Sequence, residues 1–303
     1  MAPTITTHDR YPTRFTDEPR ILERPDPVVA DDARGPGAGP LTPAQVDAFD
    51  RDGFLFLEEV FTKAETDRFL AELHRLSADD ELKRHERVIT ERDSGEVRSI
   101  FEIHRVSDLF RAMSRDARLA DVTRQLHGED VYLHQTRVNF KPGFAGKEFF
   151  WHSDFETWHS EDGMPTPRAI SASIALTDNT EHNGPLMVMP GSHKRFVSCV
   201  GETPEDNYRS SLQAQKVGTP DEDSLSQLAA EFGIIAPKGL AGSVVFFDSN
   251  IMHGSNSNIT PFARSNAFFV YNAVSNALEE PFAASAPRPS HIAHREVEVL
   301  PRN

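Results

Sequence analysis

The chain has 303 residues, and its 38% hydrophobic content with 21 phenylalanines is enough for a sizeable core in one large domain or two smaller ones. A formal charge of −15 argues against a nucleic acid or an anionic membrane surface as partner. No run approaches the roughly 20 apolar residues of a membrane span. The single cysteine, Cys199, excludes an internal disulfide, and the polar start predicts no secretory signal, so we expect a cytoplasmic protein.

The N-terminal part predicts an arm followed by helices. Residues 1–40 are rich in proline and glycine and should form an extended arm without a core of its own. Two helices then begin at capping boxes, in which Ser or Thr is followed three residues later by Glu or Gln. The boxes are Thr42 with Gln45 and Thr62 with Glu65, and the short strand 54–57 lies between the two helices. A densely charged segment, 79–92, should be an exposed loop.

From Val131 onward the pattern changes to strands with unusually polar faces. Strand 131–141 would place five side chains on one face: Leu133, Gln135, Arg137, Asn139 and Lys141. This row could be the solvent face of an ordinary strand or the inner wall of a barrel that holds a polar ligand. Strand 169–177 repeats the pattern, with small hydroxyl side chains on one face. The strands alone leave the choice open.

The stretch 149–168 contains the clearest candidate for a metal site. Its first half resembles an aromatic-rich strand, on which His152 and Asp154 would point to the same side. Two histidines and one carboxylate form the site of non-haem Fe(II) oxygenases, although the same ligand types also bind zinc. The spacing alone is weak evidence, because His127-Gly128-Glu129 matches a similar pattern. There Gly128 should end helix 116–126, and we expect His127 to be solvated.

The second half of the chain supplies further candidates. His253 follows closely after strand 242–247, at a strand end, where functional residues concentrate. The last strand, 264–275, would place Arg264, Asn266 and Phe268 on one face. The other predicted features are turns at 183–186 and 190–194 with a solvated His193, a long loop or lid at 200–217, helix 221–231, and a loosely structured tail from 283.

The strands and their order predict a mainly β fold with flanking helices, a double-stranded β-helix of the cupin-like jelly-roll type. The order His152-x-Asp154, then His253, then Arg264 resembles the Fe(II)/2-oxoglutarate-dependent dioxygenases, and the turns at 183–186 and 190–194 resemble their phytanoyl-CoA hydroxylase branch. The stretch 150–165 closely resembles the signature of the ectoine hydroxylases. We therefore predict an arm (1–40), a single dioxygenase domain (41–282) and a tail (283–303).

The resemblance implies a role for each matching residue. It implies that iron is held by His152, Asp154 and His253. It implies that 2-oxoglutarate is bound by Lys141, Ser255, Arg264, Asn139 and Phe149. It implies that ectoine is surrounded by Gln135, Trp158, Phe247, Asn266 and Phe268. Fe(II), 2-oxoglutarate and O2 would then yield 5-hydroxyectoine, succinate and CO2, and a homodimer is the expected assembly.

Neighbouring residues have simpler interpretations. Phe150 and Trp151 are expected to pack in the core, whereas Trp158 lies in a polar segment and is expected to contact substrate. His159, Glu156 and Asp162 are expected to order the loop, and Arg137 is a substrate contact from strand parity only. Three other functions stay open: the same chemistry on an amino acid or acyl-CoA, a zinc hydrolase, and a non-catalytic metal-binding or ligand-sensing jelly roll.

Overall fold

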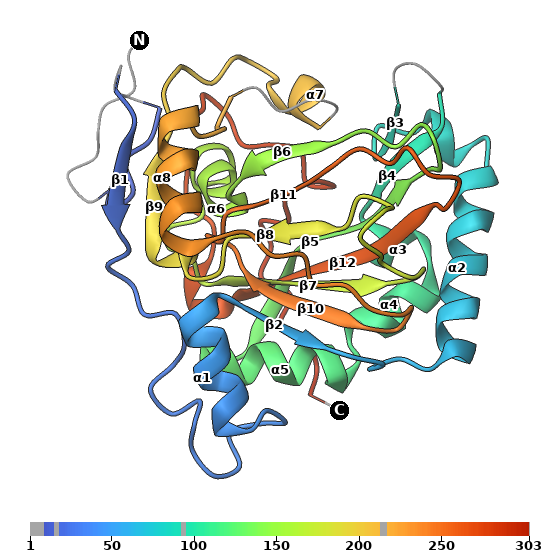
Figure 1. The fold of residues 1–303 in the computed structure, drawn as a ribbon, viewed down its shortest axis with the longest axis horizontal. Helices are drawn as coiled ribbons and strands as arrows, with labels where there is room; N and C mark the ends of the chain where they lie inside the picture. Colours follow the sequence, from blue (N-terminus) through green and yellow to red (C-terminus); the bar gives the residue numbers. More distant parts are fainter. Residues whose placement is uncertain (1–8, 15–17, 92–94, 213–216, 303) are drawn as a thin grey trace.

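The computed structural model describes residues 9–14, 18–91, 95–212 and 217–302, and two antiparallel sheets dominate it (Figure 1). The larger sheet has, in spatial order, strands β2 (Phe54–Leu57), β10 (Val244–Asp248), β7 (Ala169–Ala175), β12 (Arg264–Ala273), β5 (Val131–Lys141), β4 (Val97–Phe101) and β3 (Val88–Thr90). The smaller sheet has β6 (Phe149–His152), β11 (His253–Ser255) and β8 (Leu186–Val188). A third pair joins β1 (Arg20–Glu23) to β9 (Arg195–Ser198).

The helices lie mainly outside the sheets. They are α1 (Pro43–Asp52), α2 (Lys63–Ala78), α3 (Ile103–Val106), α4 (Asp108–Ser114), α5 (Ala117–His127), α6 (Asp154–Thr157), α7 (Tyr208–Ser211) and α8 (Glu222–Phe232). Short 3-10 or π turns occupy Leu82–Arg84, Trp158–Asp162, Ser192–Lys194 and Val274–Asn276. None of the helices built from the described residues is long and apolar enough to cross a membrane.

The apolar face of the large sheet packs against the helices, and its polar face points toward the small sheet. On β7, Ile170, Ala172 and Ile174 belong to the main core, while Ser171 and Ser173 alternate with them. Figure 1 shows α1 and α5 on the side of the large sheet that faces away from β6, β11 and β8. The polar rows are therefore the interior of a barrel, which decides between the two interpretations that the strand pattern left open.

One irregularity changes the predicted face of β5. Val270 of β12 pairs with Gln135 of β5, but the next residue of β12, Tyr271, pairs with Leu133. His134 therefore has no partner on β12 and forms a bulge in β5. Because a side chain changes face at such a bulge, Leu133 packs in the main core with Tyr271. Leu133 therefore does not share a face with Gln135, contrary to strict alternation.

Several local predictions are confirmed and others are wrong. Both capping boxes are present, and Gly128 ends α5 as expected, while Asp116 lies at its N-cap and not inside the helix. The two histidines that we expected to be solvated, His127 and His193, are buried, because the surface near each is covered by a distant segment. The charged segment 79–92 is only partly a loop, since it also supplies β3 to the large sheet.

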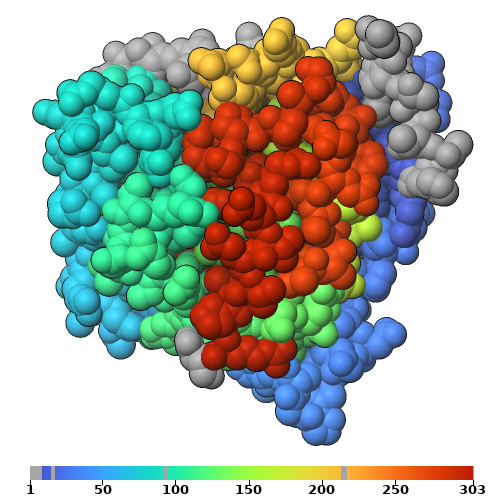
Figure 2. All heavy atoms as spheres, turned by 180° about the vertical axis from the view of Figure 1, so that it is seen from behind, coloured from blue at the N-terminus to red at the C-terminus, as the bar shows by residue number. Residues whose placement is uncertain are grey.

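The described part of the arm and the C-terminal segment both pack on the barrel. Tyr11 is fully buried, with its ring 4.9 Å from that of Phe155 and 5.2 Å from that of Phe196. Figure 2 shows the C-terminal segment, in red, lying across the back of the molecule. Ile292 and Ala293 in that segment are 1% exposed, so the expectation of a loose tail is wrong. A proline-rich segment needs no regular elements to be ordered when the domain beneath offers it partners.

Two glycines with the same backbone conformation allow a test of this packing. Gly53, which caps α1, and Gly37 in the arm both have φ of 76°. A Cβ at Gly53 would lie 2.3 Å from Nδ1 of buried His193, whereas one at Gly37 would meet nothing within 4 Å. Gly37→Ala should lower the free energy of unfolding by about 1–2 kcal/mol, the cost of a left-handed conformation. Gly53→Ala should cost about 1–3 kcal/mol more, because His193 must move. Urea unfolding measures both, and equal losses would contradict the predicted collision.

Candidate metal centre and active site

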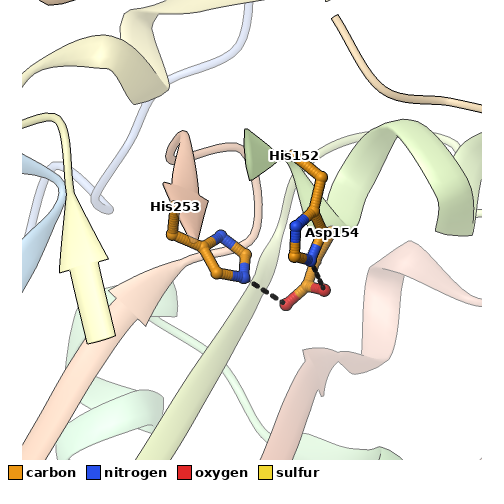
Figure 3. A group of neighbouring side chains, drawn as sticks. All are labelled: His152, Asp154 and His253. Atoms are coloured by element: carbon orange, nitrogen blue, oxygen red, sulfur yellow. Dashed lines mark ion pairs between the residues drawn. The ribbon is translucent and has the colours of Figure 1, made fainter. Parts of the chain in front are cut away.

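Three side chains converge between β6, α6 and β11. His152 ends β6 and His253 begins β11, and the two residues are paired across these strands. Asp154 Oδ1 lies 3.6 Å from His152 Nε2, and its Oδ2 lies 3.9 Å from His253 Nε2 (Figure 3). One ligand atom from each residue falls within 4.8 Å of the others. Two imidazoles and a carboxylate at such distances could hold one metal ion.

The turn between His152 and Asp154 differs from the prediction. We expected both residues on one strand, but β6 stops at His152 and Ser153 caps α6, where Asp154 is the first helical residue. The Ser153 hydroxyl accepts a hydrogen bond from the backbone N–H of Glu156, as an N-cap does. The carboxylate thus meets the imidazoles because the chain turns from strand to helix, and not because of strand parity.

Hydrogen bonds orient the two imidazoles. His152 Nδ1 lies 2.7 Å from the Phe150 carbonyl oxygen, and His253 Nδ1 lies 3.0 Å from that of Ile251. A carbonyl only accepts, so each Nδ1 carries the proton and each Nε2 presents a lone pair to the centre. Asp154 Oδ2 is buried without a hydrogen-bond partner among the described residues. An orphaned carboxylate oxygen facing two lone pairs is the donor set that a divalent cation would complete.

The charges of these groups suit metal binding. Burial, and then the neighbouring His152, lowers the pKa of His253 to about 4. Burial acts to raise the pKa of Asp154, but His253, His152 and Arg137 hold it well below its usual range. Near neutral pH the imidazole of His253 is therefore neutral and the carboxylate is ionised, which is the state in which both bind a metal.

A pocket opens beside the three residues. Its walls come from β4, β5, β6, α6, the loop before α8 and the C-terminal segment. It is lined by Ser99, Phe101, Gln135, Arg137, Asn139, Phe149, His152, Asp154, Thr157, Trp158, Ser211, Leu212 and Arg288. Of the predicted substrate residues, Gln135 and Trp158 line this pocket. So do Asn139 and Phe149, which were assigned to the cosubstrate.

The three other predicted substrate residues are not among the described residues that line this pocket. Phe247 is fully buried, with its ring 5.2 Å from the His253 ring. The Phe268 ring lies under the Arg137 guanidinium, 4.7 Å from ring centroid to Cζ. Asn266 donates a hydrogen bond to Ser173 Oγ at 3.1 Å. The structure shows these three residues in contact with His253, Arg137 and Ser173. Their contact with a substrate stays a prediction.

Lys141, Ser255 and Arg264 form a separate buried group. Lys141 is paired with Arg264 across β5 and β12, and Lys141 Nζ donates to Ser255 Oγ at 2.8 Å. The Arg264 Nη1 atom donates to Asn266 Oδ1 at 3.4 Å, while Nε has no partner among the described residues. The ion pairs found among those residues give neither cation a carboxylate. Two buried cations without a counter-ion are unfavourable unless an anion joins them.

The pKa values of Lys141 and Arg264 are both lowered, because burial is not offset by an ion pair with a carboxylate among the described residues. Burial lowers the pKa of Arg264 to about 10. Burial, and then the nearby Arg264 and Arg98, lowers the pKa of Lys141 to about 6. A carboxylate that entered this group would stabilise both charged forms.

The sequence did not single out every residue around the pocket. Arg288 lines it from the C-terminal segment and donates to both carboxylate oxygens of Asp162, at 2.7 and 2.5 Å. Nothing in the pattern of that proline-containing segment distinguished Arg288 from a surface arginine. Arg137, a candidate from strand parity alone, does line the pocket.

The predictions for the remaining residues of the signature stretch had mixed outcomes. His159 Nδ1 lies 2.8 Å from the Met164 carbonyl oxygen, so its expected structural role is confirmed. Trp151 is partly buried against the core, as expected, whereas Phe150 is 54% exposed and the prediction of core packing was wrong. Strand β6 has one extra residue between Phe149 and His152, which pair with Ser255 and His253. This bulge interrupts the alternation, so Phe150 faces outward although His152 points to the centre.

Comparisons with known proteins agree with this architecture. The model of the phytanoyl-CoA dioxygenase (PhyH) family matches residues 49–266. The chain belongs to this family, and the predicted barrel with flanking helices is confirmed by solved structures of similar proteins.

The similar proteins extend over nearly the whole chain. An ectoine dioxygenase from Stutzerimonas stutzeri is 54% identical over 290 residues, 95% of either chain. A crystal structure of EctD from S. alaskensis with 2-oxoglutarate and 5-hydroxyectoine is 48% identical and has a TM-score of 0.87, covering 96% of either chain. A crystal structure of the same protein with bound Fe is 47% identical, with a TM-score of 0.86, and covers 96% of this chain and 97% of that one.

The converging side chains predict the outcome of ligand removal. His152→Ala, Asp154→Ala or His253→Ala should each lose tightly bound metal, because each change removes one of three ligands. Metal content after dialysis, measured by mass spectrometry, tests this. His182→Ala is the matched control, since that side chain is 72% exposed and its ion-pair contact is with Glu181 and not with the three ligands. A full complement of metal in any of the three variants would remove that residue from the set.

Proposed function

We propose that this chain hydroxylates ectoine to 5-hydroxyectoine, using Fe(II), 2-oxoglutarate and O2 and releasing succinate and CO2. The observation that carries the proposal is the placement of the three converging ligands. Two of them line a pocket with aromatic, amide and guanidinium groups, and the strand of the third, β11, also carries Ser255 of the buried basic group Lys141 and Arg264. The ectoine dioxygenases and the EctD structures support it, because they match nearly the whole chain.

In this proposal His152, Asp154 and His253 are the iron ligands. Three protein ligands on one face leave other coordination positions open for the cosubstrate and O2. Iron bound there would supply the redox chemistry that couples decarboxylation of 2-oxoglutarate to insertion of one oxygen atom into a C–H bond. The protein residues bind, orient and desolvate the reactants around that centre.

We assign the 2-oxoglutarate site to Lys141, Ser255 and Arg264, with Asn139 and Phe149 nearby. On β11, Ser255 lies two residues after the iron ligand His253. Ser255 pairs with Phe149 of β6, and His253 pairs with His152. Two residues of strand span roughly 7 Å, a distance that a five-carbon diacid can bridge. One end of the cosubstrate would then reach the metal while Arg264 meets the distal carboxylate, for which a guanidinium offers a bidentate fork.

We assign the open pocket to ectoine, a small ring with a delocalised amidinium and a carboxylate. Trp158 would stack against the cationic ring, and Gln135 would bond its polar groups. The guanidinium groups of Arg137 and Arg288 suit the carboxylate. Phe268 would then act mainly by supporting Arg137 from below, because the face of its ring is already covered by that guanidinium.

We also propose a cytoplasmic homodimer. The single Cys199 is buried and unpaired, which is compatible with a reducing compartment.

The homodimer would use an exposed apolar group on two loops, formed by Phe144, Ile259 and Phe262, which are 70–80% exposed. The loops are joined by a hydrogen bond from the Phe144 N–H to the Thr260 carbonyl. An exposed apolar group of this kind is a surface that a second copy could cover.

The decisive experiment is reconstitution with Fe(II) without oxygen, followed by ectoine, 2-oxoglutarate and air. Mass spectrometry should detect a product heavier than ectoine by one oxygen atom, and succinate should accumulate in equal amount. Zinc should occupy the centre and give no product, which separates oxidation from hydrolysis. If another small compound were hydroxylated and ectoine were not, the proposed reaction type would stand and the proposed substrate would be wrong.

Arg264 provides a test of the cosubstrate site. Arg264→Ala should raise the KM for 2-oxoglutarate strongly, corresponding to about 2–5 kcal/mol, because the distal carboxylate would be buried without its partner. Metal content should stay unchanged, since Arg264 is no ligand. Arg264→Lys should restore binding in part, as it keeps the charge but not the fork. A KM for ectoine that rises as much as that for 2-oxoglutarate would contradict the assignment.

Lys141 predicts a proton uptake when 2-oxoglutarate binds. Without an anion its pKa is about 6, so at pH 8 the amine is mostly neutral. A bound carboxylate favours the ammonium form and raises that pKa, so binding takes up a proton and weakens as pH rises. Calorimetry without oxygen, at pH 8 in buffers of different ionisation enthalpy, measures the uptake. Lys141→Met should abolish it, and a wild-type enthalpy independent of buffer would contradict the prediction.

A further inference from the structure

The N-terminal arm places one arginine in a buried group of charges beside the metal-binding helix. Arg14 Nε and Nη2 donate to the two carboxylate oxygens of Glu156 at 2.9 and 2.7 Å, and Nη1 donates to Glu161 at 2.8 Å. The three side chains are 0–3% exposed. A guanidinium buried so completely is stable only because two carboxylates surround it.

The same group fastens the loop that follows β9. Arg14 Nη1 also donates to Thr203 Oγ1 at 2.9 Å, and Asn207 Nδ2 donates to the Glu161 oxygen that Arg14 binds, at 2.8 Å. The Arg14 N–H donates to the Cys199 carbonyl oxygen at 2.8 Å. Loop 200–212 is therefore held at its start, at its middle and directly before α7.

This loop forms part of the pocket wall. Helix α7 begins directly after Asn207, and Ser211 and Leu212 at its end line the pocket beside Trp158. The anchor that holds Asn207 thus lies a single helical turn before the side chains that face the substrate space. Glu161 connects the two, because it belongs to the short turn that begins with Trp158.

We propose that Arg14 is a positioning residue for substrate binding, which acts through Glu161 to hold Ser211 and Leu212 against the pocket. The N-terminal arm is then part of the active site, although it lies far from the metal ligands in sequence. The proposal deepens the proposed function, since the substrate of the assay is ectoine. A wall that moves away admits water and leaves the reacting C–H bond unheld, so cosubstrate would be consumed without hydroxylation.

The first measurement compares Arg14→Gln with the wild-type holoenzyme. The KM for ectoine should rise by roughly tenfold, as expected for the loss of charge-assisted hydrogen bonds. The KM for 2-oxoglutarate and the metal content should change little, because the loop carries neither an iron ligand nor a residue assigned to 2-oxoglutarate. Succinate should form in excess over 5-hydroxyectoine, a change that a loss of stability alone would not produce.

The second measurement needs no turnover. Arg209 lies in α7 with a side chain that is 69% exposed, so trypsin can report on the loop. In the metal-loaded protein without oxygen, cleavage after Arg209 should be faster in Arg14→Gln than in wild type. This readout stays valid even if ectoine is not the substrate.

Two further variants guard against a folding defect. Asn207→Ala removes the anchor from the loop side and leaves Arg14 paired, so it should show the same changes in KM, product ratio and cleavage. Combined with Arg14→Gln it should add little, because both act through Glu161. Arg195→Gln is the control, since it removes the ion pairs of β9 with Glu23 of the same arm and with Glu231 of α8, neither of which involves Glu161.

The outcomes separate the two proposals. Wild-type KM for ectoine, product ratio and cleavage rate in both Arg14→Gln and Asn207→Ala would overturn the positioning role. So would a lowered melting temperature as the sole effect. Absence of hydroxylation by the wild-type enzyme would overturn the proposed function, while the trypsin comparison would still decide the role of Arg14.

Discussion

The pairing of His152 with His253 across β6 and β11 is the constraint on which the rest of the site depends. Hydrogen bonds from the two Nδ1 atoms to the backbone carbonyls of Phe150 and Ile251 turn the imidazoles so that both Nε2 atoms point inward. The third ligand needs no strand at all, because the helix that begins at Asp154 brings the carboxylate to the same point. A small three-stranded sheet thus determines where a metal can sit and where the cosubstrate must reach it.

Buried charge explains how the remaining parts are arranged around that point. Most buried arginines have a carboxylate: Arg14 binds Glu156 and Glu161, Arg24 binds Asp248, Arg98 binds Glu91 and Arg288 binds Asp162. Since an uncompensated buried charge is strongly unfavourable, these pairs hold distant segments together. Arg264 and Lys141 lack such a partner among the described residues, and this difference is the reason for proposing a ligand site there rather than a structural ion pair.

The described parts of the N-terminal arm and of the C-terminal segment complete the site. The arm contributes Tyr11 to the core beside Trp158 and Arg14 to the carboxylate of Glu156, in the helix that begins with Asp154. The C-terminal segment contributes Arg288 to the pocket and accepts a hydrogen bond from Gln135 at the Ile292 carbonyl. Neither end forms a regular core of its own, yet each is ordered by polar contacts with the signature stretch. The acidic residues of that stretch, Glu156, Glu161 and Asp162, are therefore anchors rather than additional metal ligands.

Sequence patterns were sufficient where local chemistry decides the structure. The capping boxes and the strands 131–141 and 264–275 follow from side-chain types at fixed spacing, and they lie where expected. The metal triad followed from the resemblance to a family and not from spacing, and its three side chains do converge. Sequence patterns could not reveal the bulge that moves Leu133 to the core, the burial of His127 and His193, or the ordered tail. Each of these depends on a partner far away in the chain. The pocket lining shows the same division. Gln135 and Trp158 could be singled out from the sequence. Arg288 and the link from Arg14 to the loop were decided by tertiary packing alone, because the position of a buried charge is set by the partner that neutralises it.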